Sequence, residues 1–315
     1  MVYTISTSKS APDFPALAIN DDKVVLTANA FRGNSFQGTE FVVVNKSQLV
    51  AGTNAAVTYF GPPQGLFTIQ PGHALTACAI AGCPLYMASV AFNSASSIQV
   101  WKLTGAPGVG GGLSVATASG IPIGSLTSPP DAKQLGTSTL IATNDNRLLE
   151  ATYRGDLNGG TLWVAANSAC VPSGDTTTRA CLRFIQLTIS ATGTGTVSKA
   201  QDFDFGQLGV YYYYPAIQTD GTGNLIAVFS GSSSGTHPGV YASGQKATEL
   251  GSFQAPLQLK SGENSYKPFA NRWGDYSGAA LDPADPSTVW VAGEYVDILG
   301  GSEWGTFITP VRIGP

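Results

Sequence analysis

The sequence predicts an all-β protein, a single β-propeller domain of five four-stranded blades that spans residues 1–315. Two observations predict this fold. A unit of strand, tight turn, strand, loop and strand occurs five times, at intervals of about 60 to 75 residues. In addition, no segment sustains the apolar period of a helix. Evenly repeated four-stranded antiparallel units are typical of β-propellers.

The repeat is clearest near the C-terminus. "DYSGAALD" (275–282) is a strand of small and apolar residues, "PADPS" (283–287) is a polar turn, "TVWVAGEYV" (288–296) is a second strand and "WGTFITPVRI" (304–313) is a third. The turns contain the Gly, Asp, Asn and Pro residues that hairpins require. We expect the first strands of the five units to begin near residues 13, 72, 147, 213 and 275.

The ring also has to close. Few residues follow the fifth third-strand, so we expect "VYTISTS" (2–8) to supply the outer strand of the last blade. Closure removes the exposed sheet edges that otherwise invite association. A six-bladed ring is the alternative, because residues 119–145 could hold a degenerate blade. We interpret that stretch as a loop-rich outer strand and a crossover.

The amino-acid composition excludes some classes of binding partner. Charged residues are 11%, the net charge is −4 and the pI is about 5.1. Phosphate binding needs clustered Lys and Arg, so nucleic acid is excluded as a partner. No apolar run is long enough for a transmembrane helix. Residues 1–17 lack the features of a signal peptide, so an exported protein would have lost its signal, with Met1 an added start. We expect a monomer.

The four cysteines form two close pairs, Cys78 with Cys83 and Cys170 with Cys181. Zinc is the alternative, but neither pair fits the spacing of a zinc site and the chain has two His. Two local disulfides are therefore favoured, which indicates an oxidising, extracellular compartment. Each pair would join neighbouring antiparallel strands.

Five motifs occur in a fixed order along residues 129–307: "PPDAKQLGT", "NDNRLLEATYRG", "LWVAANS", "YPAIQTDGTGNL" and "NRWGDYSGAALDP". In them the chain resembles a group of secreted bacterial β-propeller proteins. This resemblance implies a fold and secretion, and it implies no reaction. A wider resemblance is to sialidase-like and glycosidase propellers, in which "FRG" (31–33) is similar to the sialidase Phe-Arg motif. The sialidase Asp-box is absent from this sequence.

The first strands of propeller blades line a central channel, whose mouth is the usual binding site. Aligning the five copies predicts one ring of Asp13, Gly72, Asn146, Tyr213 and Asp275, and a second ring of Phe14, His73, Arg147, Tyr214 and Tyr276. A register slip of one residue would reverse the faces. Glu150 follows Arg147 by three residues and is expected to point inward as well.

These residue types suit sugar chemistry. Paired carboxylates hydrolyse glycosidic bonds, which makes Asp13, Glu150 and Asp275 candidate catalytic residues. His73 is a candidate general base. The rings that would stack on sugars are Tyr213, Tyr214, Tyr276 and Trp273, and the side chains that would hold a sugar carboxylate are Arg147 and Arg272.

Structural interpretations stand beside these roles. Asp13 and Asp275 would instead accept backbone N–H bonds, Arg272 and Trp273 would pack a loop between blades, and His73 would be a channel residue. Strand alternation also allows at most two of the rings of residues 211–214 to face a ligand.

The sequence thus predicts an extracellular glycan-active protein with one central site, of glycoside hydrolase type if it is an enzyme. The first alternative is a propeller that binds carbohydrate or a cell-surface partner without catalysis. The second is a polysaccharide lyase that uses His73 and a tyrosine. We expect no required cofactor, and a structural Ca²⁺ in the channel is plausible because carboxylates and carbonyls converge there.

Overall fold

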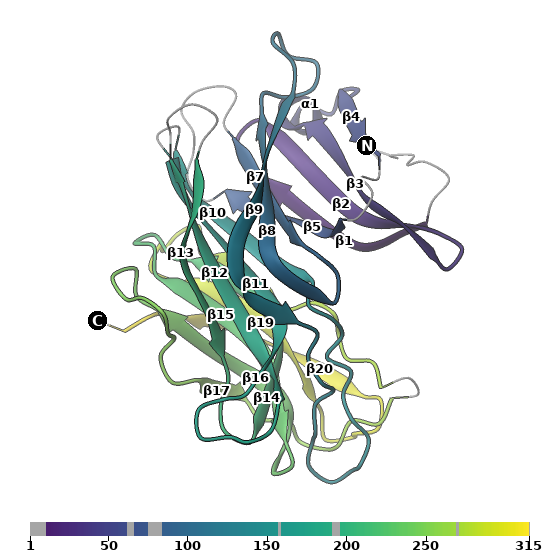
Figure 1. Cartoon of the computed structure of the whole chain (residues 1–315), viewed down its shortest axis with the longest axis vertical. Helices are drawn as coiled ribbons and strands as arrows, with labels where there is room; N and C mark the ends of the chain where they lie inside the picture. The colour runs from purple at the N-terminus through teal and green to yellow at the C-terminus, as the bar shows by residue number, and fades with distance from the viewer. Residues whose placement is uncertain are drawn as a thin grey trace. The chain divides into compact units, whose positions relative to one another are not determined.

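The computed structural model describes residues 11–61, 66–74, 84–156, 159–190, 196–268 and 271–314. These residues form an all-β protein of twenty strands and one short helix, most of which are labelled in Figure 1. No helix among them is long and apolar enough to cross a membrane. The chain divides into two compact units, one of residues 1–123, 151–163 and 186–200, the other of residues 124–150, 164–185 and 201–315.

Two antiparallel sheets belong to the first unit. The strands of one, in spatial order, are β1 (Ala11–Ile19), β2 (Lys23–Arg32), β3 (Ser35–Asn45) and β4 (Val57–Phe60). The helix α1 (Lys46–Val50) connects β3 to β4. The strands of the other sheet are β5 (Phe67–Pro71), β7 (Leu85–Val90), β8 (Ser94–Thr104) and β9 (Ser114–Thr127).

A third sheet has strands with residues in both units. Its strands, in spatial order, are β13 (Val197–Phe205), β12 (Arg179–Ser190), β11 (Gly159–Cys170), β10 (Leu148–Asp156) and β6 (His73–Ala74). The short strand β6 pairs in parallel with β10, with His73 opposite Thr152.

The second unit holds the remaining sheets. One has the order β14 (Val210–Thr219), β15 (Leu225–Ser233), β16 (Thr236–Gln245) and β17 (Leu257–Lys260). The other has three strands, β18 (Gly278–Leu281), β19 (Val289–Val296) and β20 (Trp304–Val311). The outer edge of β20 therefore has no paired strand among the described residues.

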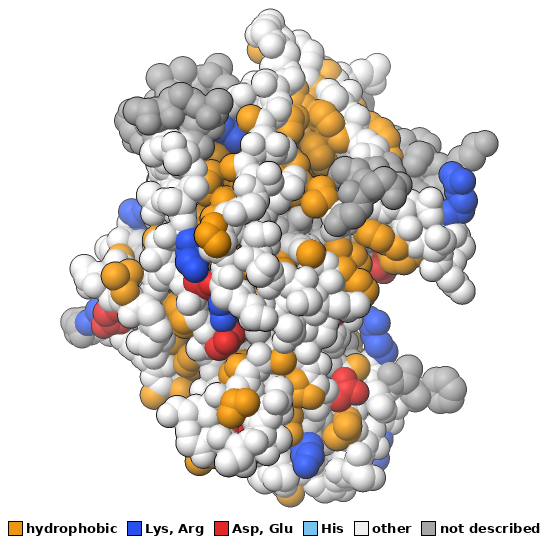
Figure 2. All heavy atoms as spheres, viewed as in Figure 1, with side chains coloured by type: hydrophobic (Ala, Val, Ile, Leu, Met, Phe, Trp, Pro, Cys, Tyr) orange, Lys and Arg blue, Asp and Glu red, His pale blue; other side chains and the backbone are white. Residues whose placement is uncertain are grey.

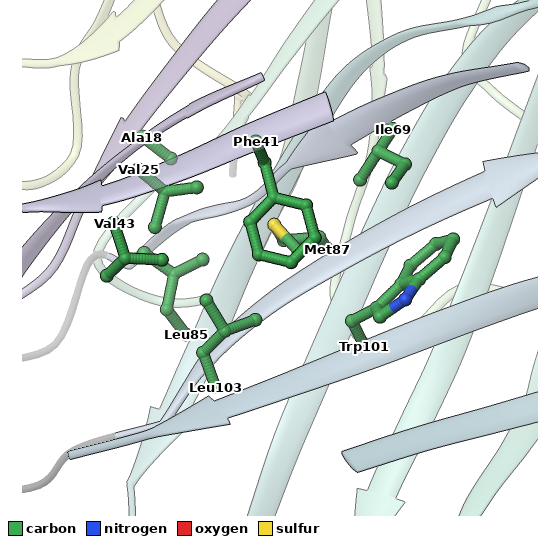
Figure 3. Close-up of a cluster of buried hydrophobic side chains, with 9 residues drawn as sticks. All are labelled: Ala18, Val25, Phe41, Val43, Ile69, Leu85, Met87, Trp101 and Leu103. Carbon is green, nitrogen blue, oxygen red and sulfur yellow. The ribbon is translucent and has the colours of Figure 1, made fainter. Parts of the chain in front are cut away.

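Each unit has its own apolar core, built by strand alternation. Figure 3 shows the cluster of the first unit, in which Phe41, Met87 and Trp101 pack with smaller side chains from β1, β2, β3, β5, β7 and β8. The cluster of the second unit consists of Ala216, Ile226, Val228, Val240, Val289 and Val291. On the face drawn in Figure 2, charged side chains are scattered among uncharged ones, as the low charged fraction predicts.

The first strands of three sheets share one irregularity. Their registers shift between Asp13 and Ala16, between Phe67 and Gln70, and between Tyr213 and Ala216. Each shift contains a non-glycine residue with positive φ: Phe14 (50°), Thr68 (50°) and Tyr214 (55°). Such a backbone is strained and persists only where the surroundings fix it. The shared bulge therefore marks Asp13, Phe67 and Tyr213 as equivalent positions.

This equivalence corrects the expected ring at one position. In the second repeat Phe67 replaces Gly72, which follows the end of β5. The N–H of Gly72 donates to the carbonyl of Tyr86 (2.8 Å), and a Cβ there would lie 3.0 Å from Leu162. Bulges insert residues that a period of two cannot register.

Five sheets follow the chain order of the five expected repeats. The stretch proposed as a sixth blade, residues 119–145, contains the end of β9 and an isolated bridge between Ala132 and Ile141, and no sheet of its own among the described residues. The expected closing strand (2–8) and the pair Cys78–Cys83 lie outside the described residues. The disulfide between Cys170 and Cys181 is confirmed, with Cα atoms 5.8 Å apart.

The Cys170–Cys181 bridge joins β11 to β12 across a sequence separation of 11. Replacing both cysteines by alanine should lower the free energy of unfolding by about 2–3 kcal/mol, because the unfolded chain regains the entropy of that loop. Urea unfolding measures this. Val171→Ala, an exposed change in the same loop, should shift stability by less than about 0.5 kcal/mol. A double alanine variant as stable as the wild type would contradict the prediction.

Candidate functional site

A pocket of about 570 Å³ lies in the second unit, where the segment 272–278 faces β19 and β20. Its lining combines charged, aromatic and small residues: Tyr266, Arg272, Trp273, Gly274, Asp275, Tyr276, Ser277, Gly278, Ala292, Gly293, Glu294, Trp304 and Thr306. Pockets that join a few polar groups to aromatic walls are the usual sites for small ligands.

Three contacts fix the segment that carries most of this lining. The carbonyl of Asn271 accepts from the N–H of Ala142 (2.8 Å). The indole Nε1 of Trp273 donates to Ser230 Oγ (3.0 Å). At the other end, Ser277 Oγ donates to the carbonyl of Tyr214 (2.8 Å). The segment is therefore held in place before any ligand arrives.

Trp273 forms an inner wall of the pocket. Its side chain is buried, and its ring contacts Tyr266 and Tyr213 edge-on, with centroids 4.9 Å and 6.3 Å away. Tyr213 is fully buried behind it, and the hydroxyl groups of Tyr213 and Ser232 are 3.1 Å apart. The exposed rings at the pocket belong to Tyr276 (53%) and Trp304 (54%).

Two carboxyl groups line the pocket in different surroundings. Asp275 forms an ion pair with Arg272 through its Oδ2 atom. Its Oδ1 atom is buried and has no hydrogen-bond partner among the described residues. Glu294, on β19, accepts a hydrogen bond from the N–H of Gly274. A Cβ at Gly274 would lie 1.9 Å from Glu294 Oε2, so only glycine allows this approach.

These surroundings set the protonation of Glu294. The pKa of its carboxyl is raised to about 7, mainly by burial and in part by the negative charge of Asp275, against the opposing effect of the Gly274 hydrogen bond. A carboxyl group with a pKa near neutrality can donate a proton at physiological pH.

Glu294 was missed by sequence reasoning, because "VWVAGEYV" was interpreted as core alternation. A comparison of the second strands gives the missing signal. Glu294 is the sixth residue of "VWVAGE", where three of the other copies, "VVLTAN", "LWVAAN" and "LIAVFS", have Asn29, Asn167 and Ser230. The second copy, "LYMASV", has the apolar Val90 there. Asn29 and Ser230 lie opposite Asp13 and Tyr213.

In these three copies the side chain at the sixth position accepts a hydrogen bond from another segment. Asn29 Oδ1 accepts from the N–H of Thr68 (2.9 Å) and Asn167 Oδ1 accepts from the N–H of Tyr214 (2.7 Å). Ser230 accepts from Trp273, as described above. The fifth sheet has an ionisable group at a position where these three copies have neutral ones.

The structure brings four of the predicted site residues into the pocket: Arg272, Trp273, Asp275 and Tyr276. Four others in the second unit do not line it, and one of these is Tyr213, which is buried against Trp273. Arg147 is buried and binds Asp145 with two hydrogen bonds (2.8 and 2.7 Å). The hydroxyl of Tyr214 donates to the carbonyl of Ala142 (3.0 Å), and burial raises its pKa. Glu150 is half-buried on β10.

The remaining two predicted catalytic residues belong to the first unit. Asp13 is exposed on β1. His73 is half-buried on β6, and burial lowers the pKa of its imidazole. The proposed roles of both stay predictions.

Comparisons with known proteins find no matching family model and no matching curated protein. Among solved structures, a protein of unknown function from Dyadobacter fermentans is 13% identical over 92% of this chain and 76% of its own, with a TM-score of 0.42. Trypanosoma rangeli sialidase in complex with sialic acid is 14% identical over 94% of this chain, and the same enzyme with the inhibitor DANA is 13% identical over 97%, both with a TM-score of 0.46. The chain spans about half the length of that sialidase, 46% and 48%.

The raised pKa of Glu294 predicts a pH-dependent stability. The folded-state pKa of about 7 exceeds the ordinary value of 4.5, so stability falls as the pH rises between these values. Glu294→Gln should therefore be more stable than the wild type above pH 7, by up to about 3 kcal/mol, and similar to it near pH 4. Urea unfolding at both pH values measures the difference.

Glu249→Gln removes an exposed carboxylate of the same unit and should show no such pH dependence. A Glu294→Gln variant whose stability difference from the wild type is the same at pH 4 and pH 8 would contradict the assignment.

Proposed function

We propose that the protein is a glycan-active enzyme of glycoside hydrolase type, and that the pocket formed by segment 272–278, β19 and β20 is its site. One observation carries this proposal. Two carboxyl groups line the same pocket, one with a pKa near 7 (Glu294) and one paired as a carboxylate with a cation (Asp275). Hydrolysis of a glycosidic bond uses such a pair, one group as acid and the other as base or nucleophile.

In this mechanism Glu294 donates its proton to the glycosidic oxygen as the bond to the anomeric carbon breaks. The carboxylate of Asp275 either takes a proton from the water that attacks that carbon, or attacks the carbon itself and forms a glycosyl ester. In the second case a water that gives its proton to the ionised Glu294 cleaves the ester and restores both carboxyl groups. The sum of the steps is the addition of one water across the glycosidic bond. Arg272 orients Asp275 through their ion pair, and the N–H of Gly274 orients Glu294. Tyr276 and Trp304 offer rings for stacking on sugar faces.

A second proposal concerns the fold that carries this site. We propose that the five sheets are the blades of one propeller, and that residues 2–8 pair with the outer edge of β20. The shared bulge in three first strands supports the repeat, and the three-stranded fifth sheet supports a missing strand. In a closed ring Asp13, Glu150 and His73 remain further candidate catalytic residues. The disulfide is consistent with an extracellular location.

Two alternatives each have a specific observation in their favour. The exposed rings of Tyr276 and Trp304 would equally serve a glycan-binding protein without catalysis. Burial lowers the pKa of the His73 imidazole, which favours the neutral form that the base of a lyase requires.

Substitution of the two carboxyl groups tests the enzyme. Asp275→Asn and Glu294→Gln should each lower kcat/KM on a glycan substrate by about 100-fold or more, as expected for the loss of acid–base catalysis. In the wild type kcat/KM should fall above pH 7, because Glu294 then loses the proton that it must donate. A screen of polysaccharides and aryl glycosides supplies the substrate.

Glu249→Gln, outside the pocket, should keep full activity. Activity that survives both pocket substitutions would refute the carboxyl assignment. Glycan binding without turnover would favour the binding protein, and an unsaturated product would indicate a lyase.

Deletion of residues 2–8 tests ring closure. The deletion should expose the edge of β20 and increase self-association, because an unpaired strand edge is a template for pairing. Size-exclusion chromatography with light scattering measures the oligomeric state. Lys9→Ala serves as a control that keeps the strand, and a deleted chain that stays monomeric and equally stable would contradict closure.

A further inference from the structure

We infer that the pocket accepts an uncharged sugar unit and rejects a sugar that carries a carboxylate. This inference rests on the proposed glycan activity and names its substrate class. It comes from the charges that face the pocket and from the partners that those charges already have.

The first step concerns the cation of the pocket. Among its described lining residues, Arg272 is the one cationic side chain, and Asp275 occupies its Nη2 atom. With Glu294 protonated the lining has a net charge of zero, and with Glu294 ionised it has a net charge of −1. A sugar carboxylate bound to Arg272 would lie beside Asp275, and like charges that share a site repel each other.

The second step concerns the other arginines of the second unit. Each is held by an aspartate, as in the buried two-bond pair of Arg147 with Asp145. The remaining pairs are Arg179 with Asp175, Arg183 with Asp202, and Arg312 with Asp285. An acidic sugar would have to displace an aspartate to obtain the bidentate contact that arginine offers to carboxylates.

The third step concerns what the pocket offers instead. Asp275 lines the pocket, and its side chain is 23% exposed. Ionised carboxylates only accept hydrogen bonds, and the hydroxyl groups of a neutral sugar are donors of matching chemistry. The exposed rings of Tyr276 and Trp304 supply apolar faces without charge. The same reasoning disfavours the lyase, because elimination needs a substrate carboxylate next to the carbon that loses its proton.

A matched substrate pair tests the inference. A 4-nitrophenyl hexoside and the corresponding hexuronide differ only in the carboxylate, and a 4-nitrophenyl sialoside adds a second acidic sugar. We expect kcat/KM to be at least about ten-fold higher for the hexoside. Preference for either acidic substrate would overturn the inference while supporting the proposed hydrolase. If no substrate is turned over, the proposed hydrolase activity is refuted. Calorimetry then compares the affinities for the free neutral and acidic sugars, and tighter binding of an acidic sugar would overturn the inference.

A charge exchange supplies a second test. Asp275→Asn leaves Arg272 without its ionised partner, so the affinity for glucuronate should rise about ten-fold, measured by calorimetry because this variant lacks a proposed catalytic group. Asp285→Asn is the matched control, since it removes the same charge from the partner of Arg312, outside the pocket. An unchanged affinity in Asp275→Asn, or an equal gain in both variants, would overturn the inference.

Discussion

The hydrogen bond from the N–H of Tyr214 to Asn167 Oδ1 (2.7 Å) is the constraint on which the site depends. It holds Tyr214 at a positive φ of 55°, a conformation that a tyrosine does not adopt without support. The carbonyl of the same residue accepts from Ser277, and its hydroxyl donates to Ala142. Ala142 in turn binds the carbonyl of Asn271. One strained residue thus holds both ends of the segment that lines the pocket.

The chemistry of the pocket depends on a difference in solvation between two carboxyl groups. Burial, with the nearby charge of Asp275, favours the neutral form of Glu294, whereas Asp275 is 23% exposed and forms an ion pair with Arg272. A buried acid with a raised pKa reduces stability at neutral pH. Sites of this kind trade stability for activity, because the group that functions best is poorly solvated in the folded state.

The low fraction of charged residues in the chain also limits which ligands the pocket can recognise. Only 11% of the residues are charged, and in the second unit the arginines are distributed among aspartates one by one. Paired arginines orient side chains without giving the pocket a net positive charge. Recognition therefore has to come from ring faces and carboxylate acceptors, which suit hydroxyl groups better than anions.

The sequence by itself determined the elements of this protein. Alternation and turn chemistry predicted the strands of the five repeats, and cysteine spacing predicted the Cys170–Cys181 bridge. Four pocket residues were predicted because they lie within five positions of one another, from Arg272 to Tyr276. Local chemistry is sufficient for such features.

Only the tertiary structure decided the register of the first strands and the protonation of Glu294. The bulge in β5 displaced the equivalent of Gly72, because an inserted residue leaves no mark in a period of two. Glu294 has the alternation of a core position, and its role follows from the close approach of Gly274 and from its loss of water. A pKa depends on burial and on neighbouring charges, and both exist only once distant segments have packed together.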